Sequence, residues 1–293
     1  MALANRYDAF LFDLDGVVYR AESRVEHAAD SLERLTRLGR PVAFMTNNSA
    51  RTPRQVVDKL ARVGVAAAPE DVVSSGIVTA EVLRERGVSN AFVIGEDGVL
   101  DALADAGVNV LGPDAAAADV VVVGWDRGIT YDKLRTAALL VERGAELVAT
   151  NADASYPGPD GRWPGAGALL AAVAATTGAD PFVIGKPHAP MFDAARRRTG
   201  GERPLVVGDR LDTDIEGARA LGIDSLLVLT GISTREELAS STIRPTYVAE
   251  DLRALFEDPE PVPTPEEAGH RGPPAGAAER LSGTGRRAGA AGR

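Results

Sequence analysis

The stretch FLFDLDGV, residues 10–17, is an apolar run that passes directly into two carboxylates, Asp13 and Asp15, and a glycine. Such a run is typical of a buried strand, and glycine permits the tight turn after it. In open α/β sheets, ligands bind just beyond the carboxyl ends of the strands. Two carboxylates there can hold a divalent cation, while one attacks as a nucleophile and the other moves a proton.

The same Asp-x-Asp-Gly pattern also occurs in calcium-binding loops. Such a loop needs an oxygen ligand at position 17 and a glutamate at position 24, but this chain has Val17 and Arg24 there. The pattern therefore argues against a calcium loop. Taken by itself, the stretch is equally compatible with an ordinary polar turn after a strand.

Short apolar runs alternate with amphipathic stretches along most of the chain, which favours an α/β protein with largely parallel sheets. The expected buried strands are residues 10–14, 42–46, 91–95, 120–124, 147–150, 182–185, 205–208 and 226–230. Several helix patterns end at a glycine suited to the left-handed closing position, namely Gly39, Gly64, Gly87, Gly107, Gly144 and Gly222. Thr52, Pro53 and Gln55 predict a helix start with a capping box.

Two further strand ends carry polar residues. The stretch VAFMTNNS, residues 42–49, ends in a hydroxyl at Thr46 and in backbone N–H groups that suit a phosphoryl group. A loop that caps the next helix is the alternative. In Ile184-Gly-Lys186-Pro187 the proline disfavours helix at the lysine. Lys186 could neutralise carboxylates and phosphate oxygens, although a lone Lys-Pro is more often a surface turn.

A fourth strand end is LVVGDRLDTDI, residues 205–215. Asp209 is well placed as a metal ligand, and Asp214 could be a direct or supporting ligand in the first helical turn. Helix capping by Asp212 or Asp214 is the alternative. Together the four strand ends offer oxygen-only ligands, which favour magnesium over zinc. They also supply the charge neutralisation that phosphoryl transfer requires.

The composition narrows the classes of function. The chain has 293 residues, 45% of them hydrophobic, which suits one or two domains. A net charge of -10 argues against nucleic acid and against anionic membranes as partners. The absence of cysteine excludes disulfides, thiolate metal sites and cysteine nucleophiles. No targeting segment and no apolar run of ~20 residues is visible, so we expect a soluble, cytoplasmic protein.

The C-terminal part differs in kind from the rest. Residues 259–293 are rich in Pro, Gly, Ala and Arg and have almost no large apolar residues. Such a segment cannot bury enough surface to offset its chain entropy. We therefore expect a disordered tail.

The four motifs, in this order, resemble those of the haloacid dehalogenase superfamily, and the resemblance covers about residues 6–257. The insert between the second and third motifs resembles the α/β cap of the type IIA group, the NagD-like phosphatases. The resemblance implies a Rossmann-like, doubly wound parallel-sheet core with an inserted α/β cap domain. The core would comprise residues 1–83 and 182–258, and the cap residues 84–181, including the cap-like stretch Thr150-Asn-Ala-Asp153.

The resemblance also implies a magnesium-dependent phosphomonoesterase that acts on a small phosphorylated metabolite through an aspartyl-phosphate intermediate. Asp13 would be the nucleophile and Asp15 the general acid and base, with Thr46 and Lys186 completing the catalytic set. The implied substrate- and phosphate-binding residues are Thr46, Asn47, Asn48, Lys186, Asn151 and Asp153. The implied Mg²⁺ ligands are Asp13, the backbone carbonyl of Asp15, Asp209 and Asp214.

Several alternatives stay open on the sequence alone. The loop 151–165 contains Tyr156, Arg162 and Trp163. These residues would contribute to substrate selection. The alternative is that Tyr156 and Trp163 only pack within the cap. Glycerol phosphate, phosphoglycolate, sugar phosphates, pyridoxal phosphate and nucleoside monophosphates are all compatible substrates. The alternative functions are a phosphotransferase or phosphomutase on the same fold, and a phosphate-binding module without catalytic activity. A homodimer through the cap is expected by analogy alone.

Overall fold

The first of two parallel sheets positions the carboxylates that the sequence singled out. The computed structural model describes residues 1–158, 160–259 and 261–262. The strand order of this sheet is β15-β14-β13-β1-β4-β5, and every neighbouring pair is parallel. Its strands are β1 (Ala9–Asp13), β4 (Val42–Thr46), β5 (Val72–Ser74), β13 (Pro204–Gly208), β14 (Asp224–Val228) and β15 (Tyr247–Ala249). The winding direction reverses between β1 and β13, and α/β sheets bind ligands at such a switch point.

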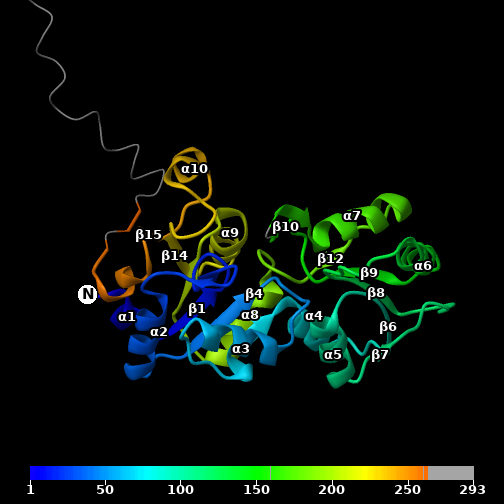
Figure 1. Cartoon of the computed structure of the whole chain (residues 1–293), viewed down its shortest axis with the longest axis horizontal. Helices are drawn as coiled ribbons and strands as arrows, with labels where there is room; N and C mark the ends of the chain where they lie inside the picture. The colour runs from blue at the N-terminus through cyan, green and yellow to red at the C-terminus, as the bar shows by residue number, and fades with distance from the viewer. Residues whose placement is uncertain (159, 260, 263–293) are drawn as a thin grey trace, which may run out of the picture. The chain divides into compact units, whose positions relative to one another are not determined.

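Helices cover both faces of this sheet (Figure 1). Phe10 and Phe12 pack in a cluster with residues of α1 (Leu3–Arg6), α2 (Ala28–Arg37) and α3 (Pro53–Arg62). Leu11 points to the opposite face, as alternation along a strand requires. There it packs with residues of α4 (Ser75–Glu85), α8 (Ala189–Thr199) and α9 (Glu216–Ala220). The central strand β1 is therefore buried on both sides, which explains its unbroken apolar sequence.

A second parallel sheet is inserted between β5 and β13. Its order is β12-β9-β8-β6-β7, built from β6 (Asn90–Ile94), β7 (Asn109–Val110), β8 (Val120–Val123), β9 (Glu146–Ala149) and β12 (Phe182–Val183). Helices α6 (Tyr131–Glu142) and α7 (Ala166–Thr177) lie over one face of this sheet and α5 (Asp97–Asp105) over the other (Figure 1). The side chains of each face pack with those of the helices that cover it. The insert is thus an α/β cap on a Rossmann-like core, as the sequence predicts.

Shorter elements complete the described chain. The antiparallel hairpins are β2 (Tyr19–Arg20) with β3 (Ser23–Arg24), and β10 (Ser155–Gly158) with β11 (Gly161–Pro164). The remaining helical elements are a 3₁₀ turn Pro69–Asp71, a π-helix Leu211–Ile215, α10 (Arg235–Ser240) and a 3₁₀ helix Leu252–Phe256. Within the described ranges, no helix combines the length and apolarity that a membrane span requires.

All eight predicted strands are present, with ends that differ by at most two residues. The six predicted closing glycines all have positive φ, and the capping box between Thr52 and Gln55 forms. The strand Phe182–Val183 pairs with β9, so the second sheet extends past residue 181, where the cap was expected to end. The tail expected to be disordered lies outside the described residues from position 263 onward.

Candidate active site

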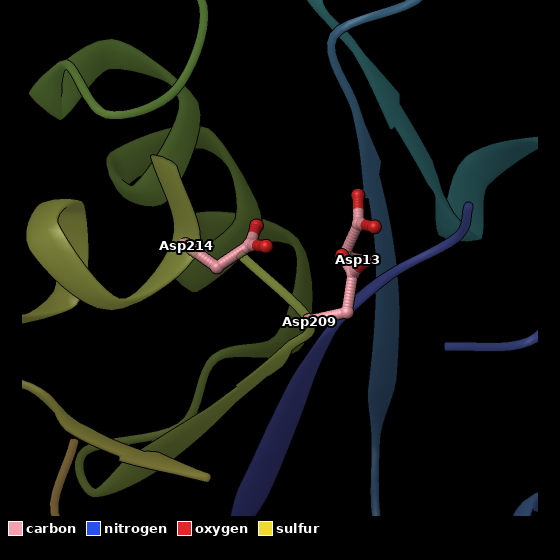
Figure 2. Close-up of side chains that lie close together, drawn as sticks. All are labelled: Asp13, Asp209 and Asp214. Carbon is pink, nitrogen blue, oxygen red and sulfur yellow. The ribbon is translucent and has the colours of Figure 1, made fainter. Parts of the chain in front are cut away.

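Three carboxylates meet where β1 and β13 end. Asp13 is the last residue of β1, Asp209 directly follows β13, and Asp214 lies in the π-helix Leu211–Ile215. One oxygen of each carboxylate lies within 4.8 Å of those of the other two, and all three residues are buried. Figure 2 shows the three side chains close together. The strand ends therefore concentrate three acidic groups at the switch point of the sheet.

A buried lysine faces this cluster. Lys186 is 5% exposed, and its Nζ donates to Asp13 Oδ1 at 2.5 Å and to Asp214 Oδ1 at 2.6 Å. Burial lowers the pKa of Lys186, but the two carboxylates outweigh burial and raise the pKa above its usual value. Lys186 is therefore an ammonium. One ammonium beside three carboxylates leaves two negative charges in a buried space when all three are ionised.

The excess charge and a free acceptor fit a divalent cation. Burial raises the pKa of Asp13 well above its usual range, and burial and then Asp214 raise the pKa of Asp209 to about 7. Asp209 Oδ2 accepts a hydrogen bond from Ile232 N at 2.7 Å. Asp209 Oδ1 is buried and has no hydrogen-bond partner within the described ranges. Oxygen-only donors with this charge are what hard divalent cations prefer.

Two glycines make the space for Asp209. Gly16 has φ +88°, and a Cβ atom on it would lie 2.3 Å from Asp209 Oδ2. A Cβ atom on Gly231 would lie 1.8 Å from the same oxygen. Any side chain at either position would displace the carboxylate. The glycine of the Asp-x-Asp-Gly motif thus makes room for the Asp209 carboxylate as well as permitting the turn.

The loop after β4 supplies a hydroxyl beside the cluster. Asn48 N donates to Thr46 Oγ1 at 3.1 Å, which orients the hydroxyl and leaves its own hydrogen for another acceptor. Thr46 and Asn48 line the same cavity as Asp13 and Asp15. This cavity places a hydrogen-bond donor, an ammonium and two carboxylates around one small space.

The amide of Asn47 joins three segments of the chain. Its Nδ2 donates to Asp153 Oδ2 at 2.9 Å and to Lys186 O at 3.1 Å, and its Oδ1 accepts from Lys186 N at 2.8 Å. The other oxygen of Asp153, Oδ1, accepts from Arg210 Nη1 at 3.0 Å. Asn151 Nδ2 donates to Asn47 O at 2.7 Å. The cap loop after β9 is thereby tied to the loops after β4 and β13.

These contacts predict that Asp153 restrains the β10–β11 hairpin. Asp153→Ala removes the bonds to Asn47 and Arg210, and a charge-assisted bond contributes roughly 1.5–3 kcal/mol. We expect amide hydrogens of residues 155–164 to exchange about tenfold faster, because the hairpin opens more often. Asp212→Ala is the matched control. Asp212 also pairs with Arg210, at 2.8 Å, but its side chain is 68% exposed, and among the described residues it has no hydrogen bond or ion pair with the cap loop. Equal exchange in both variants would contradict this restraint.

The cavity gathers the residues that the sequence singled out. Asp13, Asp15, Thr46, Asn47, Asn48, Asn151, Asp153, Lys186 and Asp214 all line a cavity of about 110 Å³, and Asp209 joins it through the carboxylate cluster. Burial raises the pKa of Asp15, while Lys59 and Lys186 lower it. Of the cap-loop residues, Tyr156 lines this cavity, Arg162 lines a neighbouring groove, and Trp163 donates to Asp160.

Among the cavity-lining residues that sequence reasoning did not single out are Trp125, Arg210, Thr213 and Ile232. Trp125 comes just after Gly124 at the carboxyl end of β8, so the strand-end rule that found Asp13 would also have found it. Arg210 lies beside Asp209 in the fourth motif. Ile232 carries no local signal, since its position depends on the backbone bond to Asp209.

Known proteins are similar to this chain over most of its length. A haloacid dehalogenase-like hydrolase family model matches residues 10–109, and a HAD-hydrolase-like model matches residues 183–255. The 5'-nucleotidase YutF of Bacillus subtilis is 36% identical over 249 residues, which cover 84% of this chain and 96% of that protein. An acid sugar phosphatase of Staphylococcus epidermidis is 38% identical over 255 residues, 86% of this chain and 98% of that protein.

A solved structure extends the similarity to three dimensions. Glycerol phosphate phosphatase Rv1692 from Mycobacterium tuberculosis, in complex with magnesium, superposes with a TM-score of 0.83 at 35% identity. The match covers 88% of this chain and 79% of that chain. With this identity, this coverage and the motif-bearing strand ends described above, the chain belongs to the haloacid dehalogenase-like hydrolases.

Proposed function

We propose that this chain is a magnesium-dependent phosphomonoesterase that hydrolyses a small phosphorylated metabolite. The observation that carries the proposal is the buried cluster of Asp13, Asp209 and Asp214 against Lys186, with Asp15 and Thr46 on the same cavity. The names of the similar proteins, which include a nucleotidase and two phosphatases, support the reaction class. The magnesium in the similar structure supports the metal.

The proposed reaction has two covalent steps. A carboxylate oxygen of Asp13 attacks phosphorus, and the bond from phosphorus to the leaving oxygen breaks while Asp15 gives that oxygen a proton. The product alcohol departs and leaves an aspartyl phosphate. Water then attacks phosphorus and gives its proton to Asp15, and the bond from phosphorus to Asp13 breaks. Inorganic phosphate is released with both side chains restored.

Other side chains hold the groups in place. Lys186 binds Asp13 Oδ1, so we assign attack to the other oxygen, with Lys186 and the Thr46 hydroxyl binding phosphoryl oxygens. Both ends of the Asn47 amide are engaged by protein groups. We therefore propose that Asn47, Asn151 and Asp153 support the phosphate-binding loop, and that Asn48 orients Thr46.

The residues of the cluster would also hold the cation. Asp13, Asp209, Asp214 and the backbone carbonyl of Asp15 are the proposed ligands, and oxygen-only ligands favour magnesium. When bound, the cation would balance the two excess negative charges and polarise the phosphoryl oxygens. The unpartnered Oδ1 of Asp209 would gain the partner that it lacks within the described part of the chain.

Metal removal tests the proposal directly. With EDTA, we expect no release of inorganic phosphate from any ester of a panel of glycerol 3-phosphate, glucose 6-phosphate, AMP and 4-nitrophenyl phosphate. Adding Mg²⁺ should restore release from at least one of them. Mg²⁺ should also raise the melting temperature, since a ligand at about 100 times its Kd adds roughly 2.7 kcal/mol to stability. Asp209→Asn should lose most of this rise.

The assay contains no phosphate acceptor other than water. Release of inorganic phosphate under these conditions therefore distinguishes a phosphatase from a phosphotransferase or phosphomutase. Undiminished release in EDTA would contradict the metal dependence. No release from any ester with Mg²⁺ present would contradict the phosphatase function and favour a phosphate-binding module.

A further inference from the structure

Two stacked aromatic side chains form one wall of the catalytic cavity. Trp125 follows the end of β8, and Tyr156 lies in β10 of the hairpin. Their ring centroids are 4.2 Å apart and the ring planes are inclined by 29°. Both side chains line the cavity that also contains Asp15. The pair therefore combines a residue from the cap sheet with one from the cap hairpin.

Further contacts hold the Trp125 side chain of this wall in place. Trp125 Nε1 donates to Pro164 O at 3.0 Å, which joins the sheet end to β11. The Arg127 guanidinium lies 5.3 Å from the Trp125 ring centroid, and two bonds of 2.8 and 2.7 Å hold it on Glu96. A large planar side chain that contacts Tyr156, Arg127 and the Pro164 carbonyl cannot easily move aside for a bulky ligand.

The leaving group must point toward this wall. In the proposed reaction the leaving oxygen lies within hydrogen-bond reach of Asp15, which protonates it. A larger groove of about 790 Å³ adjoins the cavity and shares Lys186, Arg210 and Ile232 with it. That groove is lined by neither Asp15 nor the two aromatic residues. A leaving group beside Asp15 therefore faces Trp125 and Tyr156, which line the cavity and not the groove.

The cavity that Asp15, Trp125 and Tyr156 line is small. The cavity of about 110 Å³ is well below the ~300–1,000 Å³ of typical pockets for drug-sized ligands. We infer that Trp125 and Tyr156 limit the size of the leaving group. The substrate is then the phosphomonoester of a short polyol or hydroxy acid of about two to four carbons, and nucleoside monophosphates are excluded. This inference rests on the proposed phosphatase function.

Substrate selectivity tests the inference. We would measure kcat/KM for glycerol 3-phosphate and for AMP in the full-length wild type, Tyr156→Ala and Trp125→Ala. The wild type should favour glycerol 3-phosphate, and each alanine variant should raise the ratio of AMP to glycerol 3-phosphate at least tenfold. Continued turnover of glycerol 3-phosphate shows that the variants are folded.

Two matched variants should keep the wild-type ratio. Tyr156→Phe retains the ring and removes only the hydroxyl. Trp163→Ala removes the aromatic residue paired with Tyr156 across the hairpin, which does not line the cavity. If Trp163→Ala raises the ratio of AMP to glycerol 3-phosphate turnover as much as Tyr156→Ala does, the effect comes from a loosened hairpin. That result would overturn the size limit.

The remaining outcomes distinguish a failure of the size limit from a failure of the proposed phosphatase function. A wild type that hydrolyses AMP as well as glycerol 3-phosphate, or alanine variants with an unchanged ratio, would overturn the size limit. Variants that lose AMP turnover selectively would identify the pair as a platform for a flat leaving group, which also overturns it. If the wild type releases phosphate from neither ester nor from 4-nitrophenyl phosphate, the phosphatase function fails and the size limit fails with it.

Discussion

Asp13→Asn is expected to reduce phosphate release by at least about 10⁴-fold, because an amide cannot attack phosphorus and form the covalent intermediate. The substitution preserves the shape of the side chain, and Asn Oδ1 can still accept the hydrogen bond that Lys186 donates to Asp13. Release of inorganic phosphate from glycerol 3-phosphate, with Mg²⁺ present, is the measurement. Asp212→Asn is the matched control, since the same chemical change at this exposed neighbour of the cluster should leave the rate near that of the wild type.

The same variant should be more stable than the wild type in EDTA at neutral pH. Burial raises the pKa of Asp13, so the folded state disfavours the ionised carboxylate. A raised carboxyl pKa means that the folded protein holds the proton to higher pH than the unfolded chain, and stability falls as pH rises above the unfolded value of about 3.9. The gain from Asp13→Asn should therefore grow as pH rises from about 4 toward neutrality. Denaturant unfolding in EDTA at several pH values measures it.

Activity and stability would thus move in opposite directions at one residue. With Mg²⁺ present, the wild type should become more stable than Asp13→Asn, because the cation binds the carboxylate that the variant lacks. An Asp13→Asn protein that still turns over glycerol 3-phosphate would rule out Asp13 as the nucleophile. A variant less stable than the wild type in EDTA at every pH would contradict the charge argument.

Much of the site could be predicted because parallel strands end at a common edge. Asp13, Thr46 and Asp209 each follow an apolar run of four or five residues, and that local pattern fixes both the strand and its end. Parallel pairing then brings the ends together without any knowledge of strand order. Lys186 is different. It follows β12, which pairs with the second sheet, and an apolar run cannot reveal which of two parallel sheets it joins.

The contacts that depend on tertiary placement left no local signal. Asn47 and Asp153 are 106 positions apart, yet Asn47 Nδ2 donates to Asp153. An asparagine after a strand predicts a turn or a cap and says nothing about so distant a partner. The stacking of Trp125 on Tyr156 likewise depends on how the β10–β11 hairpin lies against the end of β8. The short strand β5 was not predicted because three residues, Val72–Ser74, are too few for a periodic pattern.

Lys186→Met should produce the largest loss of stability among single substitutions in the site. The ammonium is the cation bound to Asp13 and Asp214, and methionine has similar length but no charge. Removing one partner of a buried ion pair costs about 3–5 kcal/mol, because the remaining charge stays buried and unpaired. Phosphate release should also fall to near background, since no ammonium would remain to bind the phosphoryl oxygens. Denaturant unfolding at pH 7 in EDTA measures the stability.

A comparison at another lysine isolates the role of the cluster. Lys133 Nζ lies 2.6 Å from the buried carboxylate of Asp126, but the Lys133 side chain is 39% exposed. Lys133→Met makes the same chemical change at the same pair distance, and water can reach the carboxylate that it leaves behind. We expect a clearly smaller loss of stability than in Lys186→Met, and activity near that of the wild type.

Magnesium should then distinguish the two variants. In Lys186→Met, three carboxylates face one another with no internal cation, so a divalent cation has more charge to neutralise than in the wild type. Saturating Mg²⁺ should therefore raise the melting temperature of Lys186→Met by more than that of the wild type, and should leave Lys133→Met with a wild-type response. Restored stability without restored activity would show that Lys186 serves catalysis separately from its role in balancing the cluster. If Mg²⁺ stabilises Lys186→Met no more than Lys133→Met, the three carboxylates are not the cation site.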